Sequence, residues 1–129
     1  MVKVKFRHLE AIYKGVNELN DCKMQFKTKL KLRDIQEKLE KEIEWFEKQR
    51  LELLNTYSKK NEEGKPIIEN NNYVLDNSDE FIRRFEELLN TEFDIQPLER
   101  ELIENLELSG RAWDGLFHIL ERGENVNEG

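Results

Sequence analysis

The feature that most constrains this chain is a long apolar stripe between residues 28 and 59. Its members are Leu32, Ile35, Leu39, Ile43, Phe46, Leu53 and Tyr57. They recur at steps of three, four and seven residues, which is the period of one face of an α-helix. The pattern predicts a helix of about 30 residues and about 45 Å. Because a compact domain of this size is only about 30 to 35 Å across, we expect the helix to protrude or to be covered by another subunit.

The stripe is broader than the two-residue seam of a simple coiled coil. Trp45, Leu51 and Leu54 lie beside it, and Arg50 interrupts it at a position that would otherwise face a core. A broad apolar face needs more cover than one helix supplies. The sequence therefore predicts that this helix pairs with another helix or with a second copy of the chain, as a homo-oligomer.

Shorter elements precede the long helix. Residues 2–6 alternate apolar side chains with Lys3 and Lys5, which predicts a short half-buried strand that needs a partner. Residues 8–19 carry an apolar stripe at helical spacing, weakened by Gly15. Residues 22–32 alternate lysines with apolar residues. We interpret their first part as extended and their second part as the start of the long helix.

The remaining elements follow a Gly and Pro break. Residues 65–76 predict a β-hairpin that turns at three consecutive asparagines, 70–72. Asn77 and Glu80 have capping-box spacing before a helix that ends near residue 90. Residues 92–96 alternate as an edge strand closed by Pro97. Residues 98–108 fit either a short helix or an irregular connection, and Ser109 caps a last helix that ends at Gly123.

These elements make the chain mainly α with a small β element, an α+β protein. We expect one domain over residues 1–123, with the long helix over about 28–59 and the hairpin over about 65–76. Residues 124–129 are expected to form a disordered tail. The balance of 38% charged and 37% hydrophobic residues is typical of long solvent-exposed helices.

Charge divides the chain into two unequal halves. Residues 1–60 hold 15 Lys/Arg against 10 Asp/Glu, and residues 61–129 hold 6 against 18. We expect the halves to fold against each other and to neutralise part of this difference. A single cysteine, Cys22, forbids an internal disulfide, and no apolar run is long enough for a membrane span. The sequence predicts a cytoplasmic protein with no membrane partner.

Two carboxylates, Glu92 and Asp94, raise the question of chemistry, because they would share one face of the strand over 92–96. A divalent metal or catalytic site needs several oxygens that converge on one point. The favoured interpretation is a solvated edge face whose charges discourage association between sheets. An acidic patch that binds a partner is the other alternative.

A basic cluster holds the other candidate contacts, Lys27, Lys29, Lys31 and Arg33. We favour a solvated face here, followed by pairing with an acidic partner or with the protein's own acidic half. The acidic net charge argues against nucleic-acid binding, since phosphate binding normally shows as a basic domain. Trp45 fits a core position or an interface anchor.

The residues offer little for catalysis. Cys22 with His8 and His118 gives three ligands where structural zinc takes four, and a thiol–imidazole pair has no supporting nucleophile turn. The six glycines form no phosphate-binding loop. The sequence therefore predicts no enzyme activity, no catalytic residue, no cofactor and no metal site.

The order of elements resembles a family of small phage and prophage proteins of Gram-positive bacteria, known as a domain of unknown function. The resemblance covers about residues 30 to 120, and these residues match the pattern: Tyr73, Asp76, Phe81, Phe85, Leu88, Leu89, Glu92, Asp94, Ile95, Leu108 and Ser109. It implies a phage or prophage origin and supplies no catalytic residues.

With that origin, three functions are open. The first is a non-enzymatic protein that binds a protein partner, either a host or host-defence factor that it inhibits or a phage component that it helps to assemble. The second is an oligomeric binder or sponge for a phosphorylated metabolite or signalling nucleotide beside Lys27, Lys31 or Arg33. The third is a nucleic-acid-binding accessory protein.

Overall fold

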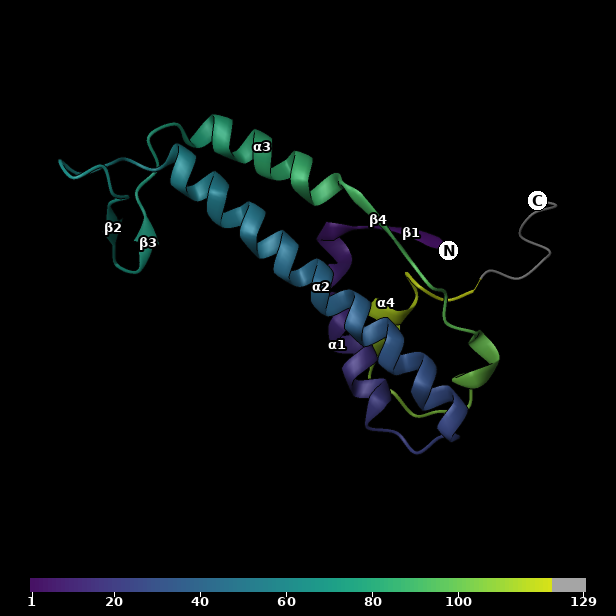
Figure 1. The fold of residues 1–129 in the computed structure, drawn as a ribbon. Helices are drawn as coiled ribbons and strands as arrows, with labels where there is room; N and C mark the ends of the chain where they lie inside the picture. Colours follow the sequence, from purple (N-terminus) through teal and green to yellow (C-terminus); the bar gives the residue numbers. More distant parts are fainter. Residues whose placement is uncertain (122–129) are drawn as a thin grey trace.

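The chain folds into a packed end and a projection, and one helix runs through both. The computed structural model describes residues 1–121. Figure 1 shows the long helix α2 (Phe26–Tyr57) leaving a cluster of short elements and continuing beside α3 (Ser78–Asn90). We call residues 1–39 and 92–121 the body, and residues 40–91 the arm. At 32 residues, α2 is about 48 Å long, so the expected protrusion is confirmed.

The body contains the strand pair that the N-terminal pattern required. Strand β1 (Val2–Lys5) pairs antiparallel with β4 (Glu92–Ile95), and Val4 lies opposite Phe93. Side chains alternate along β4, with Phe93 and Ile95 buried and the two acidic residues exposed. The 3-10 turn η1 (Phe6–His8) then connects β1 to α1 (Leu9–Asn20).

Helices α1 and α4 (Gly110–Leu116) pack against each other unusually closely, because glycines lie in their contact. A Cβ added at Gly115 would stand 2.0 Å from the Ala11 carbonyl oxygen, and one at Gly15 would stand 2.8 Å from that of Ala112. Gly15 therefore weakens the helix locally but permits the approach of its neighbour. Residues with less than 2% of their surface exposed complete the core: Ile12, Val16, Leu19, Leu32, Ile35, Leu39, Ile95, Leu98, Ile103, Leu116 and Ile119.

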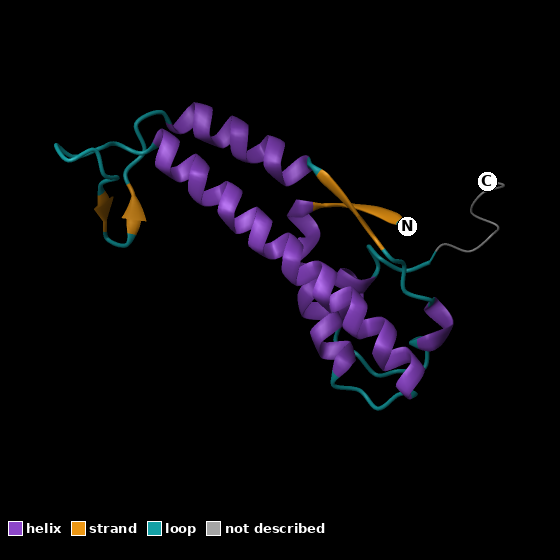
Figure 2. Cartoon of the chain, in the orientation of Figure 1, coloured by secondary structure: helices purple, strands orange, loops and turns teal. Residues whose placement is uncertain are grey.

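The arm consists of the second half of α2, a hairpin and α3, as the secondary-structure colours of Figure 2 show. Strands β2 (Ile68–Glu69) and β3 (Asn72–Tyr73) pair antiparallel through a two-residue turn. Asn70 and Asn71 adopt positive φ values of 51° and 66° in this turn, a conformation that asparagine tolerates. The hairpin is confirmed, although Asn72 belongs to a strand and not to the turn.

Two helix N-caps lie where the sequence predicts them, but the last helix ends earlier than predicted. Asn77 Oδ1 accepts from the Glu80 backbone N–H at the start of α3, and Ser109 Oγ accepts from that of Ala112 at the start of α4. The expected end of the last helix at Gly123 is wrong, because α4 ends at Leu116. The chain then turns, so that its backbone can pair with Leu98 from residues 119 and 121.

Two further expectations concern the end of the chain. Residues 98–108 contain the 3-10 turn η2 (Arg100–Leu102) and are otherwise irregular. The tail expected over 124–129 lies outside the described residues. Among residues 1–121, no helix combines the length and the apolar composition that a membrane span requires.

Ion pairs between the basic and acidic halves of the sequence hold the fold across long separations. Lys3 pairs with Asp94 at 3.1 Å, and Arg7 pairs with Glu86 at 2.7 Å. Lys31 pairs with Glu99, and this contact lowers the pKa of the Glu99 carboxyl. The expected mutual neutralisation of the halves is therefore present in the fold, although exposed pairs of this kind contribute little stability each.

Candidate functional site

The apolar surface of the arm is only partly covered. No hydrophobic residue between positions 40 and 91 is fully buried. The half-buried ones on its helices are Ile43, Phe46, Leu53, Leu54, Tyr57, Phe81, Phe85, Leu88 and Leu89. Leu51 and Ile82 are 42% and 57% exposed. Two helices can cover only one stripe of each other, so the remaining apolar surface faces solvent.

Aromatic contacts fix the arm to the body. The ring of Phe6 lies 4.9 Å from that of Phe93 and 5.6 Å from that of Phe46, and Phe46 in turn lies 6.1 Å from Phe85. Phe85 stacks on Phe81 at 5.7 Å. Such ring pairs add stability beyond the area that they bury. The chain of rings gives the base of the arm a defined direction from the body.

Trp45 lies at this junction. Its ring is 5.2 Å from that of Phe6, and 43% of the residue remains exposed. The core position of Trp45 is therefore only partly met, and its role as an interface anchor stays a prediction. One side of the indole packs on the body, and the other side is available to a partner.

The acidity of the protein is concentrated on the arm. Residues 40–91 carry 13 Asp/Glu against 8 Lys/Arg, a net charge of −5. The body, over residues 1–39 and 92–121, carries 13 against 12, a net charge of −1. Dividing the sequence at residue 60 hides this distribution, because the first 21 residues of the arm, 40–60, belong to the basic half.

Most cations of the arm helices are bound to carboxylates on the same helix. Arg50 pairs with Glu47 at 2.9 Å, and Arg83 pairs with Glu80 at 2.5 Å. The hydrogen bond from Arg83 lowers the pKa of the Glu80 carboxyl. Within residues 1–121, Glu44 and Glu52 take part in no ion pair. In the same range, Lys41 and Lys48 take part in none either, so the negative charge of the arm follows from its excess of acidic residues.

The structure places Glu92 and Asp94 on the exposed face of β4, where lysines of β1 oppose them. Asp94 pairs with Lys3, and Glu92 lies in register with Lys5. No group of three or more His, Cys, Asp or Glu side chains that could hold a metal ion occurs within residues 1–121. The geometry is that of a charged outer face, the interpretation that the sequence favoured.

The basic cluster lies on the first turns of α2 and is largely engaged within the chain. Lys29 Nζ donates to the Asn20 carbonyl, and Lys31 binds Glu99. Arg33 Nε lies 3.6 Å from a Glu37 carboxylate oxygen, and Lys27 is exposed. Pairing with the protein's own acidic half, one of the alternatives considered from the sequence, thus holds within residues 1–121 for Lys31 alone among these four residues.

Sequence reasoning missed one residue of the arm surface, Ile82. It follows Phe81 and lies off the stripe of Phe81, Phe85 and Leu88, so its position on the helical wheel already indicates exposure. Together with Leu51 it marks the apolar surface that α3 and α2 leave uncovered. Neither a family model, nor a curated protein, nor a solved structure matches the chain.

Proposed function

We propose that this protein works by binding another protein through the arm, and that the partner offers a basic, partly apolar helical surface. The observation that carries the proposal is the run of residues 40–91, which contains two amphipathic helices and no fully buried hydrophobic side chain. A helix of a partner protein, packed on this surface, would cover the apolar side chains that remain exposed after α2 and α3 pack against each other. Trp45 stands at the inner end of the surface as an anchor.

Charge favours a heterologous partner over a second copy. Two arms with a net charge of −5 each would meet with like sign, whereas a basic partner would gain from the same charges. A second copy of the chain, which the sequence pattern predicts, would compete with such a partner for this surface. Salt screens these charges, so the preference for a basic partner over a second copy should be largest at low ionic strength.

The proposal requires no catalytic step, since binding alone would deliver the function. The resemblance in the sequence extends it to a phage or prophage setting, with inhibition of a host factor or assembly of a phage component as the outcome, inside the host cytoplasm. Ligand binding beside Lys27, Lys31 or Arg33 receives less support, because Lys31 already binds Glu99. Nucleic acid remains the third candidate.

A synthetic amphipathic helix of leucines and lysines serves as the probe for the arm. Fluorescence anisotropy of the labelled peptide should show binding to the protein, and a leucine–glutamate peptide of the same pattern should bind at least about tenfold more weakly. Sedimentation velocity of the protein alone should give a monomer. If the protein were instead a dimer that dissociates when arm residues are substituted, a second copy of the chain, and not a basic partner, would be what binds the arm.

Arm substitutions separate this binding from general attraction between opposite charges. Leu51→Glu with Ile82→Glu makes the arm more negative but removes its exposed apolar side chains. The proposal expects weaker binding of the leucine–lysine peptide, whereas attraction by charge alone would make binding stronger. Leu30→Glu is the matched control, since Leu30 is 44% exposed on α2 but lies in the body. Equal binding by the arm and control variants would overturn the proposal.

A further inference from the structure

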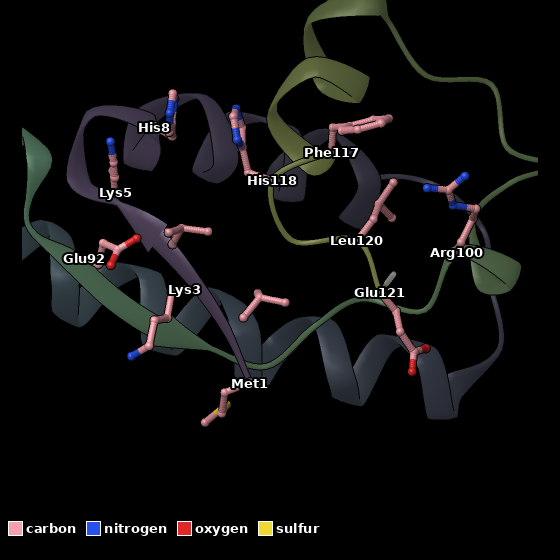
Figure 3. A pocket seen from close by; sticks show the side chains of 12 residues that line it. Met1, Lys3, Lys5, His8, Glu92, Arg100, Phe117, His118, Leu120 and Glu121 are labelled. Carbon is pink, nitrogen blue, oxygen red and sulfur yellow. The ribbon is translucent and has the colours of Figure 1, made fainter. Parts of the chain in front are cut away.

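A groove in the body lies on the side of β1 that β4 does not cover. It has a volume of about 870 Å³, within the range of ligand pockets. One wall is β1, and the other is the chain after α4, including Phe117, Leu120 and Glu121. Figure 3 shows β1 between Glu92 on one side and Leu120 and Glu121 on the other.

The hydrogen-bond pattern shows which backbone groups of β1 face the groove. Phe6 N–H donates to the Thr91 carbonyl at 3.0 Å, and the same register pairs Val4 with Phe93. Alternate residues of an antiparallel strand bond to the same neighbour. Both backbone groups of Lys3 and the N–H of Lys5 therefore point away from β4, and no other segment of residues 1–121 bonds to them. The Lys5 carbonyl is different, because it accepts the first hydrogen bond of the 3-10 turn η1. The groove thus contains an unpaired strand edge.

We propose that an extended, acidic segment of a partner protein binds in this groove as an antiparallel strand on the free edge of β1. Lys3 would supply an N–H and a C=O group for pairing, and Lys5 would supply an N–H, as in other cases of strand addition to a sheet edge. The site is separate from the arm, so the proposal does not depend on the function proposed above.

The occupied edge of β1 indicates the chemistry of the partner. There, acidic residues of β4 lie opposite the lysines, and Asp94 pairs with Lys3 at 3.1 Å. A strand on the free edge would meet the same two lysine side chains from the other side. Alternation of acidic and apolar residues, as in β4 itself, would place carboxylates beside the lysines and apolar side chains toward Leu120.

The same lysines argue against a second copy of β1 on this edge. Two antiparallel β1 strands would bring Lys3 and Lys5 of one chain against those of the other, and like charges on opposing strands destabilise a sheet. Lysines are a common protection of strand edges against self-association. They exclude a basic strand but not an acidic one.

The far end of the groove holds two stacked histidines, and the opposite wall holds an arginine. His8 and His118 stack with their ring centres 4.0 Å apart, next to Lys5 in Figure 3. Burial first, and then the charges of His118, Arg7 and Lys5, lower the pKa of His8 below its usual value. Arg100 lies over the exposed ring of Phe117, 6.0 Å from its centre, on the opposite wall.

The probe is the blocked peptide acetyl-Thr-Glu-Val-Glu-Val-Thr-amide, titrated into isotopically labelled full-length protein and followed by NMR. We expect shifts at the amides of Lys3 and Lys5 and slower hydrogen exchange there. N-methylation of the two peptide Glu residues, which face β1 in this register, should weaken binding about fivefold, since the backbone hydrogen bond to the Lys3 carbonyl is lost. N-methylation of the two Val residues is the matched control and should have little effect.

Two protein variants separate the contribution of the Lys5 backbone N–H to peptide binding from the contribution of its side-chain charge. Lys5 has an extended φ of −85°, so Lys5→Pro is compatible with the strand and removes the N–H that faces the groove. It should weaken peptide binding more than Lys5→Gln, which removes the charge alone. Equal binding by the two methylated peptides would overturn the proposal. Slow exchange of the Lys3 and Lys5 amides without peptide would do the same, because the edge would then already be covered.

Discussion

The body and the arm share one helix, and the difference between them lies in what covers it. In the body, α2 contacts α1, and Leu32, Ile35 and Leu39 are at most 1% exposed. In the arm, α3 is the main neighbour of α2, and Leu53 and Tyr57 on the same stripe are only half-buried. Periodicity therefore sets which face of a helix is apolar. The number of neighbouring elements sets how far that face is removed from water.

Stability should be distributed in the same way. Hydrophobic stabilisation is roughly proportional to the apolar area that is buried, and the fully buried hydrophobic side chains all belong to the body. Regions with few buried contacts open locally at a lower free energy than the core. We therefore expect the arm to open without the body, unless a partner covers it.

The largest expected effect is the contrast between two leucines of α2. Leu39→Ala removes a fully buried side chain and should lower the free energy of unfolding by about 3 kcal/mol. Leu53→Ala in the arm should cost about 1 kcal/mol, because water already reaches the site. Urea unfolding followed by circular dichroism measures both. Equal losses would mean that the arm is covered in solution.

How much of this contrast the sequence predicts can be judged from the same helix. The residues of α2 and the face of its stripe follow from spacing, and so do the caps at Asn77 and Ser109, because these are local properties. The pairing of β1 with β4 joins residues about 90 positions apart, and the short strands alone do not specify it. The end of α4 at Leu116 was missed because pairing with Leu98 competes with helix continuation there.

The candidate sites were less predictable than the fold. Glu92 and Asp94 were correctly placed on an outer face, since alternation along a strand is local. The free edge of β1 could not be found from sequence, because it depends on which side β4 occupies. Likewise, the concentration of negative charge on the arm appears only when residues 40–91 are recognised as one structural unit.

A second prediction tests the close packing on which the body depends. Gly115→Ala would place its Cβ 2.0 Å from the Ala11 backbone oxygen, so α1 and α4 must separate. We expect a loss of about 2 kcal/mol, which is within the usual cost of overpacking. Gly110→Ala, with no atom within 4 Å of the added Cβ, is the control and should be neutral or slightly stabilising. Thermal unfolding compares the two, and similar melting temperatures would contradict close packing.

The smallest expected effect is a pH dependence confined to the body. The pKa of folded His8 lies below its usual value of 6.5, through burial first and then the charges of His118, Arg7 and Lys5. Its neutral form is therefore favoured by folding. That contribution is complete above pH 6.5 and is lost as the pH falls through 6.5 toward the folded pKa. In the arm, the pKa of Glu80 is lowered instead, so its contribution is lost only below the usual carboxyl value of 4.5.

Between pH 6.5 and 5, His8 should therefore weaken the body while the arm is unaffected. Hydrogen exchange at these two pH values, corrected for the intrinsic rate, should show faster opening in α1 and α4 and no change in α3. His8→Gln should remove the pH dependence, and His118→Gln should reduce it by removing one of the facing charges. If α3 responded as strongly as α1, the two regions would open as one cooperative unit, and the distinction between body and arm would fail.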